Sequence, residues 1–260
     1  MNHSIRFGKF ALLALSTATL VACGGDDTPA PAPVPLSSEC TPTTAQASGT
    51  NIYQVSDGRG WQGQRTDQQV WNESVEYQGR KVLRDRVYQR TTYTAPESMA
   101  GLIAYQMRET YFTWNSDGSR TLYGTAYSEN WEENVAPPDN PLDVSQTVTF
   151  DPPLVDSRFA SLQPDQSVSR AVTGTVLTTE DGVTTTQILN GSQQVTYLGQ
   201  ETVGVPAGLP LSCKFVDTWG SGDKTTSWVE KGTGLPAHVV DESANAVVFS
   251  QSLVSTTGMK

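Results

Sequence analysis

Helical periodicity is nearly absent from the pattern of hydrophobic and polar residues after residue 40. Thr, Val, Ser, Gln and aromatic residues dominate this region, and these residue types favour strands and strand surfaces. Between Tyr105 and Tyr111, alternation places three large side chains on one face of a strand. The pattern predicts an all-β fold, either a curved antiparallel meander or a partly closed barrel, with a two-sheet sandwich as the alternative.

Turn signals divide this region into candidate hairpins. The clearest hairpin joins strands at 102–114 and 121–127 through Asn115-Ser116-Asp117-Gly118, because Asp-Gly supplies the positive φ of a tight turn. Further strands are expected at 70–77, 82–93, 167–178, 183–189, 193–205, 213–219, 225–230, 237–241 and 247–254. We expect Asn190-Gly191 to open the strand that begins at residue 193.

A Pro- and Asp-rich stretch separates the first hairpins from the last ones. It runs from Trp131 to Leu162 and contains two Pro-Pro pairs. We interpret it as a loop that connects two halves of one sheet system, with a short strand around Val148 and Phe150.

The start of the chain follows the pattern of a secretory signal peptide. Arg6 and Lys9 precede a short apolar run at 11–15, and small residues follow. This run is too short to span a bilayer, which takes about 20 apolar residues. Residues 20–23, Leu-Val-Ala-Cys, resemble the bacterial lipobox at every position, which implies cleavage before Cys23 and a diacylglycerol on its thiol. An ordinary signal peptide followed by a chance cysteine is the alternative.

A polar, Pro-rich segment follows Cys23 and is expected to be a flexible tether. The predicted organisation is therefore a signal peptide at 1–22, a tether at 23–39 and a single β-rich domain at 40–260. Acyl chains such as palmitate anchor at about 0.8 kcal/mol per buried methylene. Residue 24 is Gly; in enterobacterial lipoproteins an Asp here retains the protein in the inner membrane. The resemblance therefore implies the outer membrane, with the periplasmic face favoured over the cell surface.

Charge narrows the range of partners. The chain has a formal net charge of −10, and removal of Arg6 and Lys9 with the signal peptide makes the mature chain more acidic still. An acidic surface repels nucleic acid and anionic lipid headgroups. We therefore expect no nucleic-acid partner, and contact with the membrane only through the N-terminal lipid.

Two cysteines remain once Cys23 carries lipid. Cys40 and Cys213 are an even pair in an oxidising compartment, and we predict that they form a disulfide. It would close a loop of about 174 residues, which the chain-entropy model values at roughly 5 kcal/mol at most. Two buried free thiols are the alternative.

Few residues carry recognisable chemistry. His238 is the only histidine left after the signal peptide, which excludes mechanisms with two histidines and His-rich zinc sites. The segment 220–225 resembles a phosphate loop, but Asp223 stands where that motif needs Gly, so we interpret it as a hairpin turn. No cofactor or metal is expected, and the favoured prediction is that the protein is not an enzyme.

A carboxylate-based hydrolase acting on envelope glycans is the alternative function. Glycosidase chemistry needs two carboxylates and is helped by aromatic platforms. Candidate acids near the long loop are Glu132, Glu133, Asp139 and Asp143.

Aromatic residues offer candidate binding positions. We single out Tyr105, Tyr111, Trp114 and Trp131 as possible walls of an apolar groove or sugar-stacking platform. Packing in the core or between strands is the alternative explanation.

The C-terminal region resembles a group of uncharacterised bacterial envelope lipoproteins. The resemblance rests on Glu-Thr-Val-Gly-Val-Pro-Ala-Gly at 201–208, Cys-Lys-Phe at 213–215, and Trp-Val-Glu-Lys-Gly-Thr-Gly-Leu at 228–235. It covers roughly the last 110 residues well and implies a curved antiparallel sheet with no established activity. Together these features predict a binding or structural module for a hydrophobic ligand, a glycan or an envelope protein.

Overall fold

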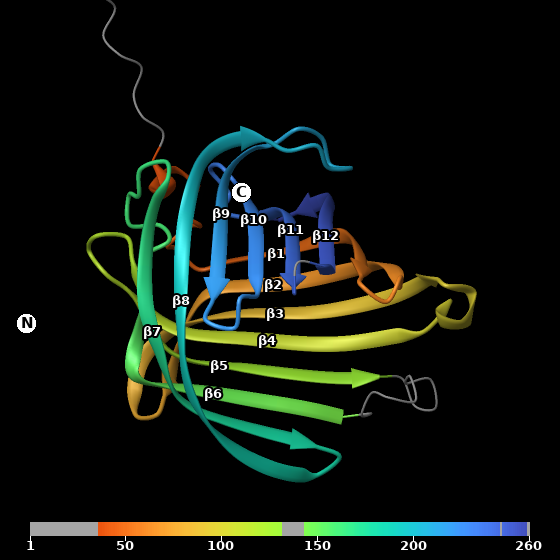
Figure 1. The fold of residues 1–260 in the computed structure, drawn as a ribbon, viewed down its shortest axis with the longest axis horizontal. Coiled ribbons are helices and arrows are strands. Elements are labelled where there is room, and N and C mark those ends of the chain that lie inside the picture. The colour runs from red at the N-terminus through yellow and green to blue at the C-terminus, as the bar shows by residue number, and fades with distance from the viewer. Residues whose placement is uncertain (1–35, 132–142, 245, 259–260) are drawn as a thin grey trace, which may run out of the picture. The chain divides into compact units, whose positions relative to one another are not determined.

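Strands make up most of the part of the chain that the computed structural model describes, residues 36–131, 143–244 and 246–258 (Figure 1). The elements are η1 (Ser37–Cys40), β1 (Ala47–Asp57), β2 (Gln62–Tyr77), β3 (Arg80–Ala95), η2 (Glu97–Met99), β4 (Ile103–Trp114), β5 (Arg120–Trp131), β6 (Asp143–Asp156), β7 (Gln166–Glu180), β8 (Val183–Thr202), β9 (Leu211–Trp219), β10 (Lys224–Glu230), β11 (Pro236–Ser243) and β12 (Ala246–Thr257). Among these residues no helix has the length and apolar character needed to cross a membrane.

Several predictions of the sequence analysis lie outside the described residues. They are the signal peptide, the lipidated Cys23, most of the tether, and the candidate acids Glu132, Glu133 and Asp139. The fold takes in residues 36–39, which the sequence analysis assigned to the end of the tether.

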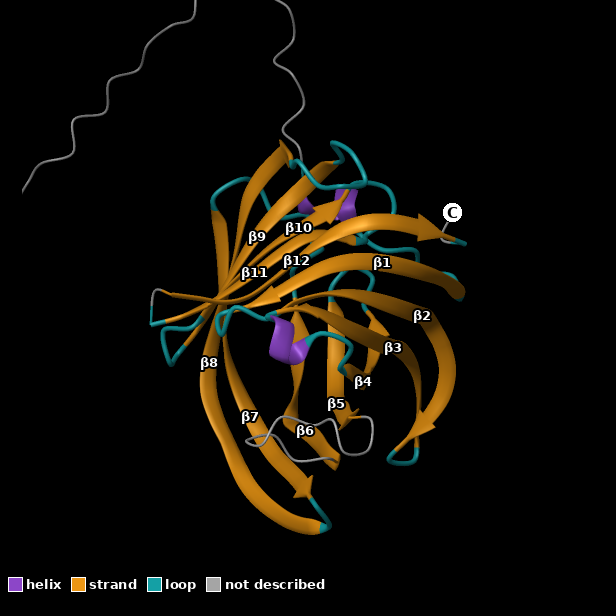
Figure 2. Ribbon diagram, turned by 90° about the vertical axis from the view of Figure 1, so that its right-hand side faces the viewer, coloured by secondary structure: helices purple, strands orange, loops and turns teal. Residues whose placement is uncertain are grey.

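The strands form a closed barrel. Each strand pairs antiparallel with the next one along the chain, and β1 pairs with β12 to close the ring. The all-β prediction of a curved meander or barrel is confirmed, and the sandwich alternative is wrong. In Figure 1 the strands β9–β12 run across the direction of β2–β6, and the long strands β7 and β8 curve between the two groups. Figure 2 shows β2 and β3 curving around the opposite side.

Successive turns of an antiparallel meander lie at alternate ends of the barrel. We call the end that carries the β1–β2 and β9–β10 turns the open end. The other end carries the β6–β7 and β10–β11 connections together with η1, and we call it the plugged end. These two names are used below for the two halves of the interior.

Two strand predictions need correction. The strand expected around Val148 and Phe150 is present, but it is the 14-residue β6, longer than the short strand within a loop that we predicted. Pro152-Pro153 falls where its pairing with β5 shifts register. Proline is tolerated there because the hydrogen-bond ladder between the two strands is interrupted, so no backbone N–H is needed. Asn190-Gly191 opens no new strand either, because both residues lie in the continuous ladder between β7 and β8.

Strand β1 was missed altogether. Its inward positions include the fully buried Asn51 and Tyr53, so polar and aromatic residues occupy the face that sequence patterns lead one to expect to be aliphatic. Pairing with the neighbouring strands stabilises β1, which pairs with β2 over ten positions, from Ala47 to Ser56.

An apolar cluster fills the plugged end. Phe159 and Leu162 from the β6–β7 connection pack against Tyr197 and Phe215 on the inner wall. Ser37 of η1 ties this connection in place, because its backbone N–H donates to the Leu162 carbonyl at 3.0 Å and its hydroxyl accepts from the Leu162 N–H at 2.8 Å.

The predicted disulfide is present within this cluster. Cys40 at the end of η1 is bonded to Cys213 in β9, with a Cα–Cα distance of 6.1 Å and both residues fully buried. The bond fixes the start of the folded chain to the middle of the sheet.

Gly234 belongs to the Gly-x-Gly motif of the C-terminal resemblance, and its role is spatial. It lies in the β10–β11 turn with φ of +70°, and a Cβ here would be 2.4 Å from the Cα of Pro42. The motif therefore makes room for the chain as it leaves η1.

Candidate functional site

A layer of buried ion pairs lies between the apolar cluster of the plugged end and the rest of the interior. We call it the ionic layer; its members are Asp85, Arg120, Asp156, Arg158, Arg170 and Asp217. Arg158 holds both carboxylate oxygens of Asp217, at 2.9 and 2.8 Å. The layer balances three positive charges against three negative ones, which offsets much of the cost of burying them.

Asp156 is the centre of the ionic layer. Its side chain is 5% exposed and lies 3.2 Å from Arg120 and 3.5 Å from Arg170. Burial alone would raise the pKa of this carboxyl, but Arg158, Arg120 and Arg170 together lower it below its usual range. Asp156 therefore stays ionised across the physiological range of pH.

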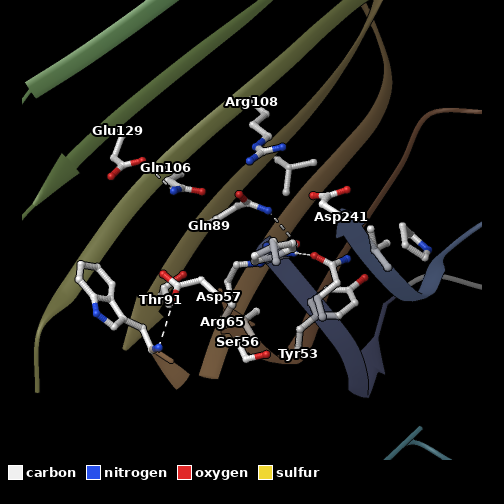
Figure 3. A pocket seen from close by; sticks show the side chains of 18 of the residues that line it. Tyr53, Ser56, Asp57, Arg65, Gln89, Thr91, Gln106, Arg108, Glu129 and Asp241 are labelled. Carbon is white, nitrogen blue, oxygen red and sulfur yellow. Dashed lines mark hydrogen bonds and ion pairs between the residues drawn. The ribbon is translucent and has the colours of Figure 1, made fainter. Parts of the chain in front are cut away.

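Beyond the ionic layer the interior is hollow. A cavity of about 640 Å³ lies between β1–β5 on one side and β10–β12 on the other, and it reaches the open end (Figure 3). Its charged lining residues are Asp57, Arg59, Arg65, Asp67, Arg108, Glu129 and Asp241. Uncharged polar residues add Gln69, Gln89, Gln106, Gln251, Ser56, Thr91 and Thr225. The cavity is of the size that small ligands occupy, and its lining combines polar and apolar surface in about equal parts.

The deep wall of the cavity is an ion pair held by glutamines. Arg65 donates to both oxygens of Asp67, at 2.8 and 3.1 Å, and to Gln251 Oε1 at 2.5 Å. Gln89 donates to Asp67 at 3.1 Å, while its own Oε1 has no partner among the described residues. The Oη of Tyr53 likewise has none, and burial raises the pKa of this phenol. The wall therefore holds polar groups that the protein itself does not satisfy.

Aromatic side chains form the rim at the open end. Tyr93 and Trp131 stack with their ring centroids 5.7 Å apart, and Trp61 meets both of them edge to face. The Arg59 guanidinium lies 3.6 Å from the centre of the Trp61 ring. Trp131 also donates its indole N–H to Glu129 at 2.7 Å, which aligns a carboxylate with the aromatic edge.

Arg108 is the cation of the cavity that has no counter-ion among the described residues. Its guanidinium lies 5.5 Å from the Tyr127 ring, and no described carboxylate is within ion-pair distance. Asp241 faces the same space from the opposite wall (Figure 3) and accepts a hydrogen bond from Thr225 at 2.6 Å. Both groups remain available to a ligand.

The structure separates the four aromatic residues that the sequence singled out. Trp131 lines the cavity. Trp114 packs edge to face on Phe112 in the core, and Tyr111 stacks on Tyr77 at 4.1 Å. Tyr105 lies beside Tyr88 at 6.4 Å. Only Trp131 of the four is therefore part of the cavity, and the other three have packing partners.

Most of the cavity residues were missed by sequence reasoning. In β2 the inward residues Arg65 and Asp67 alternate with Thr66 and Gln68, which are also polar, so no contrast marks one face as internal. Trp61 comes directly before this strand, and an aromatic residue beside a polar strand was the one available signal.

Two other residues considered for catalysis, Asp143 and His238, do not line the cavity. Asp143 is exposed at the start of β6. His238 is half-buried beside Trp228, and its Nδ1 lies 2.9 Å from the Ser252 hydroxyl; burial lowers its pKa. No cluster of three or more His, Cys, Asp or Glu residues suited to a metal ion occurs in the described ranges.

Comparisons with known proteins do not assign a family to this chain. No protein-family model matches the chain, and no curated protein matches it either. A crystal structure of a β-barrel-like protein of domain of unknown function DUF1849 from Brucella abortus is similar, with 11% sequence identity and a TM-score of 0.42. The match covers 81% of this chain and 97% of that one.

Proposed function

We propose that this protein is a lipid-anchored envelope lipoprotein whose barrel binds a carbohydrate in the open-end cavity. The observation that carries the proposal is the combination of an aromatic rim with a polar cavity wall. Sugars present apolar C–H faces and many hydroxyl groups, so aromatic rings and fixed polar side chains suit them together. Trp61 and Tyr93 supply the aromatic rings. Arg65, Gln89 and Arg108 are among the polar side chains.

The same lining argues against an acyl chain, the hydrophobic ligand that the sequence also suggested. An acyl chain in this cavity would remove water from charged groups such as Arg108 and Asp241 without replacing their hydrogen bonds. Burial of an unpaired polar group costs roughly 1–3 kcal/mol even by mutational measures, and burial of a charge costs more. A ligand rich in hydroxyls avoids this cost.

Two of the cavity carboxylates, Glu129 and Asp67, are poorly placed for hydrolysis. Glu129 accepts hydrogen bonds from Trp131, Gln106 and the Tyr127 hydroxyl. Both oxygens of Asp67 are held by donors on neighbouring side chains. A general acid must carry a proton and a general base needs a free lone pair, so carboxylates that are already held by several donors are poor candidates for either role.

Carbohydrate binding can be tested on the chain from residue 23 with Cys23→Ser, which carries no lipid. We expect soluble peptidoglycan fragments or neutral oligosaccharides from a glycan panel to change the tryptophan fluorescence on binding. Trp61→Ala should weaken binding at least about tenfold, which corresponds to about 1.4 kcal/mol. Trp219→Ala is the matched control, because Trp219 is exposed and does not line the cavity.

Two outcomes would overturn the carbohydrate proposal. One is a co-purified lipid in native mass spectra that is lost in the Trp61→Ala variant. The other is the absence of binding throughout the panel. Shortened oligosaccharides in the binding mixtures, lost on Glu129→Gln, would instead establish the hydrolase alternative.

The lipid anchor needs a separate test on the full chain. A clickable fatty acid fed to the cells should label the wild-type protein, and the Cys23→Ser variant should be unlabelled and leave the membrane fraction. An unlabelled wild-type protein would remove the anchor from the proposal and leave the cavity untouched.

A further inference from the structure

Half of strand β8 has a free edge. β8 pairs with β7 along Val183–Tyr197, but its pairing with β9 starts only at Gln193. The segment 183–192 therefore has a neighbour on one side only among the described residues. In Figures 1 and 2 the tip of the β7–β8 hairpin is the lowest part of the barrel.

The turn determines which backbone groups the free edge presents. Residues 181–182 both have positive φ, as in a two-residue hairpin, so the flanking Glu180 and Val183 exchange both backbone hydrogen bonds. From Val183 onward, the odd-numbered residues form backbone hydrogen bonds with β7. The even-numbered residues direct their backbone N–H and C=O groups toward the free edge. The Ser192 carbonyl fits this pattern, because it accepts from the Gly220 N–H at 2.8 Å on the β9 side.

Features that protect natural edge strands are missing here. Proteins usually guard exposed edges with charged residues, proline, bulges or short strands. Residues 183–192 read Val-Thr-Thr-Thr-Gln-Ile-Leu-Asn-Gly-Ser, with no charge and no proline, and pair with β7 without a bulge. Ile188 is 80% exposed and Val183 is 67% exposed. The edge combines unpaired backbone groups with exposed apolar side chains.

We infer that this edge pairs with the same edge of a second copy of the chain, antiparallel and about a two-fold axis. A two-fold dimer brings one patch onto itself, and an uncharged edge can do this even on an acidic protein. Antiparallel pairing also keeps Glu180 and Asp181 of one copy at the opposite end from those of the other, so these acids do not face each other. Thr184, Thr186, Ile188 and Asn190 supply the donors and acceptors of the new ladder. The contact is small, so we expect a weak, concentration-dependent dimer.

Sedimentation of the Cys23→Ser chain over a range of concentrations tests this inference without any ligand. We expect a monomer–dimer equilibrium that Ile188→Lys weakens by at least about tenfold, or about 1.4 kcal/mol. Leu198→Lys is the matched control, because Leu198 is an exposed residue of the same strand, 40% exposed, within the part that β9 covers. It should change the dimerisation constant less than about twofold.

Hydrogen exchange gives a second, residue-specific readout. The amides of Thr184, Thr186, Ile188 and Asn190 should exchange rapidly in dilute protein and become protected as the concentration rises, while those of Thr185 and Gln187 are protected throughout. A chain that stays monomeric up to about 1 mM, with the even-numbered amides always unprotected, would overturn the inference. So would a dimer that Ile188→Lys leaves intact. Neither result bears on carbohydrate binding, which depends on a different part of the barrel.

Discussion

Compared with the open end of the barrel, the plugged end is filled by the chain's own side chains. There, Phe159 and Leu162 close the interior, and the ionic layer beyond them is paired internally. At the open end, polar groups line a cavity, and Arg108 has no described counter-ion. One sheet thus contains two interiors, in which similar residue types serve different purposes.

This difference teaches how to interpret buried charge. Arginine and carboxylate groups occur in both halves, so their presence alone identifies no site. In the ionic layer each charge is met by a partner within the protein, which indicates a structural role. Around the cavity Arg108 and Asp241 have no ion-pair partner among the described residues, which indicates a ligand-binding role. The predictions below test this contrast between the two ends.

The largest effect is expected from Asp156→Ala in the ionic layer. The substitution leaves Arg120 and Arg170 buried without this carboxylate, and we expect a loss of about 3–5 kcal/mol in the free energy of unfolding. Urea denaturation followed by tryptophan fluorescence measures it. Asp241→Ala at the cavity is the control and should cost less than about 1 kcal/mol. Equal losses in the two variants would contradict the contrast.

The disulfide is expected to have the next largest effect. Replacing Cys40 and Cys213 by Ser should lower the free energy of unfolding by about 2–4 kcal/mol, because the unfolded chain regains its freedom. Thermal unfolding under matched conditions measures the loss. Carbohydrate binding at 25 °C should be unchanged, because neither cysteine lines the cavity. Loss of binding in a folded double variant would show that the two ends are coupled.

A smaller effect at the plugged end depends on pH. Hydrogen bonds from Lys231, the Leu36 N–H and Gln200 lower the pKa of Glu39 from 4.5 to about 2. Because the folded pKa is lowered, this carboxylate stabilises the fold fully above about pH 4.5, and the contribution disappears as the pH falls toward 2. The stability difference between wild type and Glu39→Gln should therefore shrink over this range. A difference that stays constant from about pH 6 to pH 2.5 would show that Glu39 does not act in this way.

The smallest effect on stability is expected at the cavity. Gln106→Ala removes the amide that donates to Glu129 at 2.9 Å, and should change the free energy of unfolding by less than about 0.5 kcal/mol. If the cavity binds sugar, affinity should nevertheless fall severalfold in calorimetry. Gln146→Ala, in an exposed glutamine of β6, is the control for both measurements.

The sequence predicted the strands and turns of the barrel better than the residues that line its cavity. Hairpin turns such as Asn115–Gly118 and 220–223 were visible because turn chemistry is local. The disulfide followed from counting cysteines. The cavity was not visible, because inward positions such as Arg65 and Gln89 are as polar as their outward neighbours. Which side chains remain unpartnered depends on contacts across the barrel, and no local pattern encodes them.

The disulfide also decides how mechanical force enters the fold. A pull on the chain at residue 36 reaches η1 first, and the bond from Cys40 passes the load to β9. Strand β9 is gripped along both edges, by β8 and by β10. Without the bond, tension would run on through residues 41–46 to β1 and would break its pairs with β2 and β12 one after another. The cross-link thus gives the barrel a firm point of attachment on its plugged side and leaves the opposite mouth free of load.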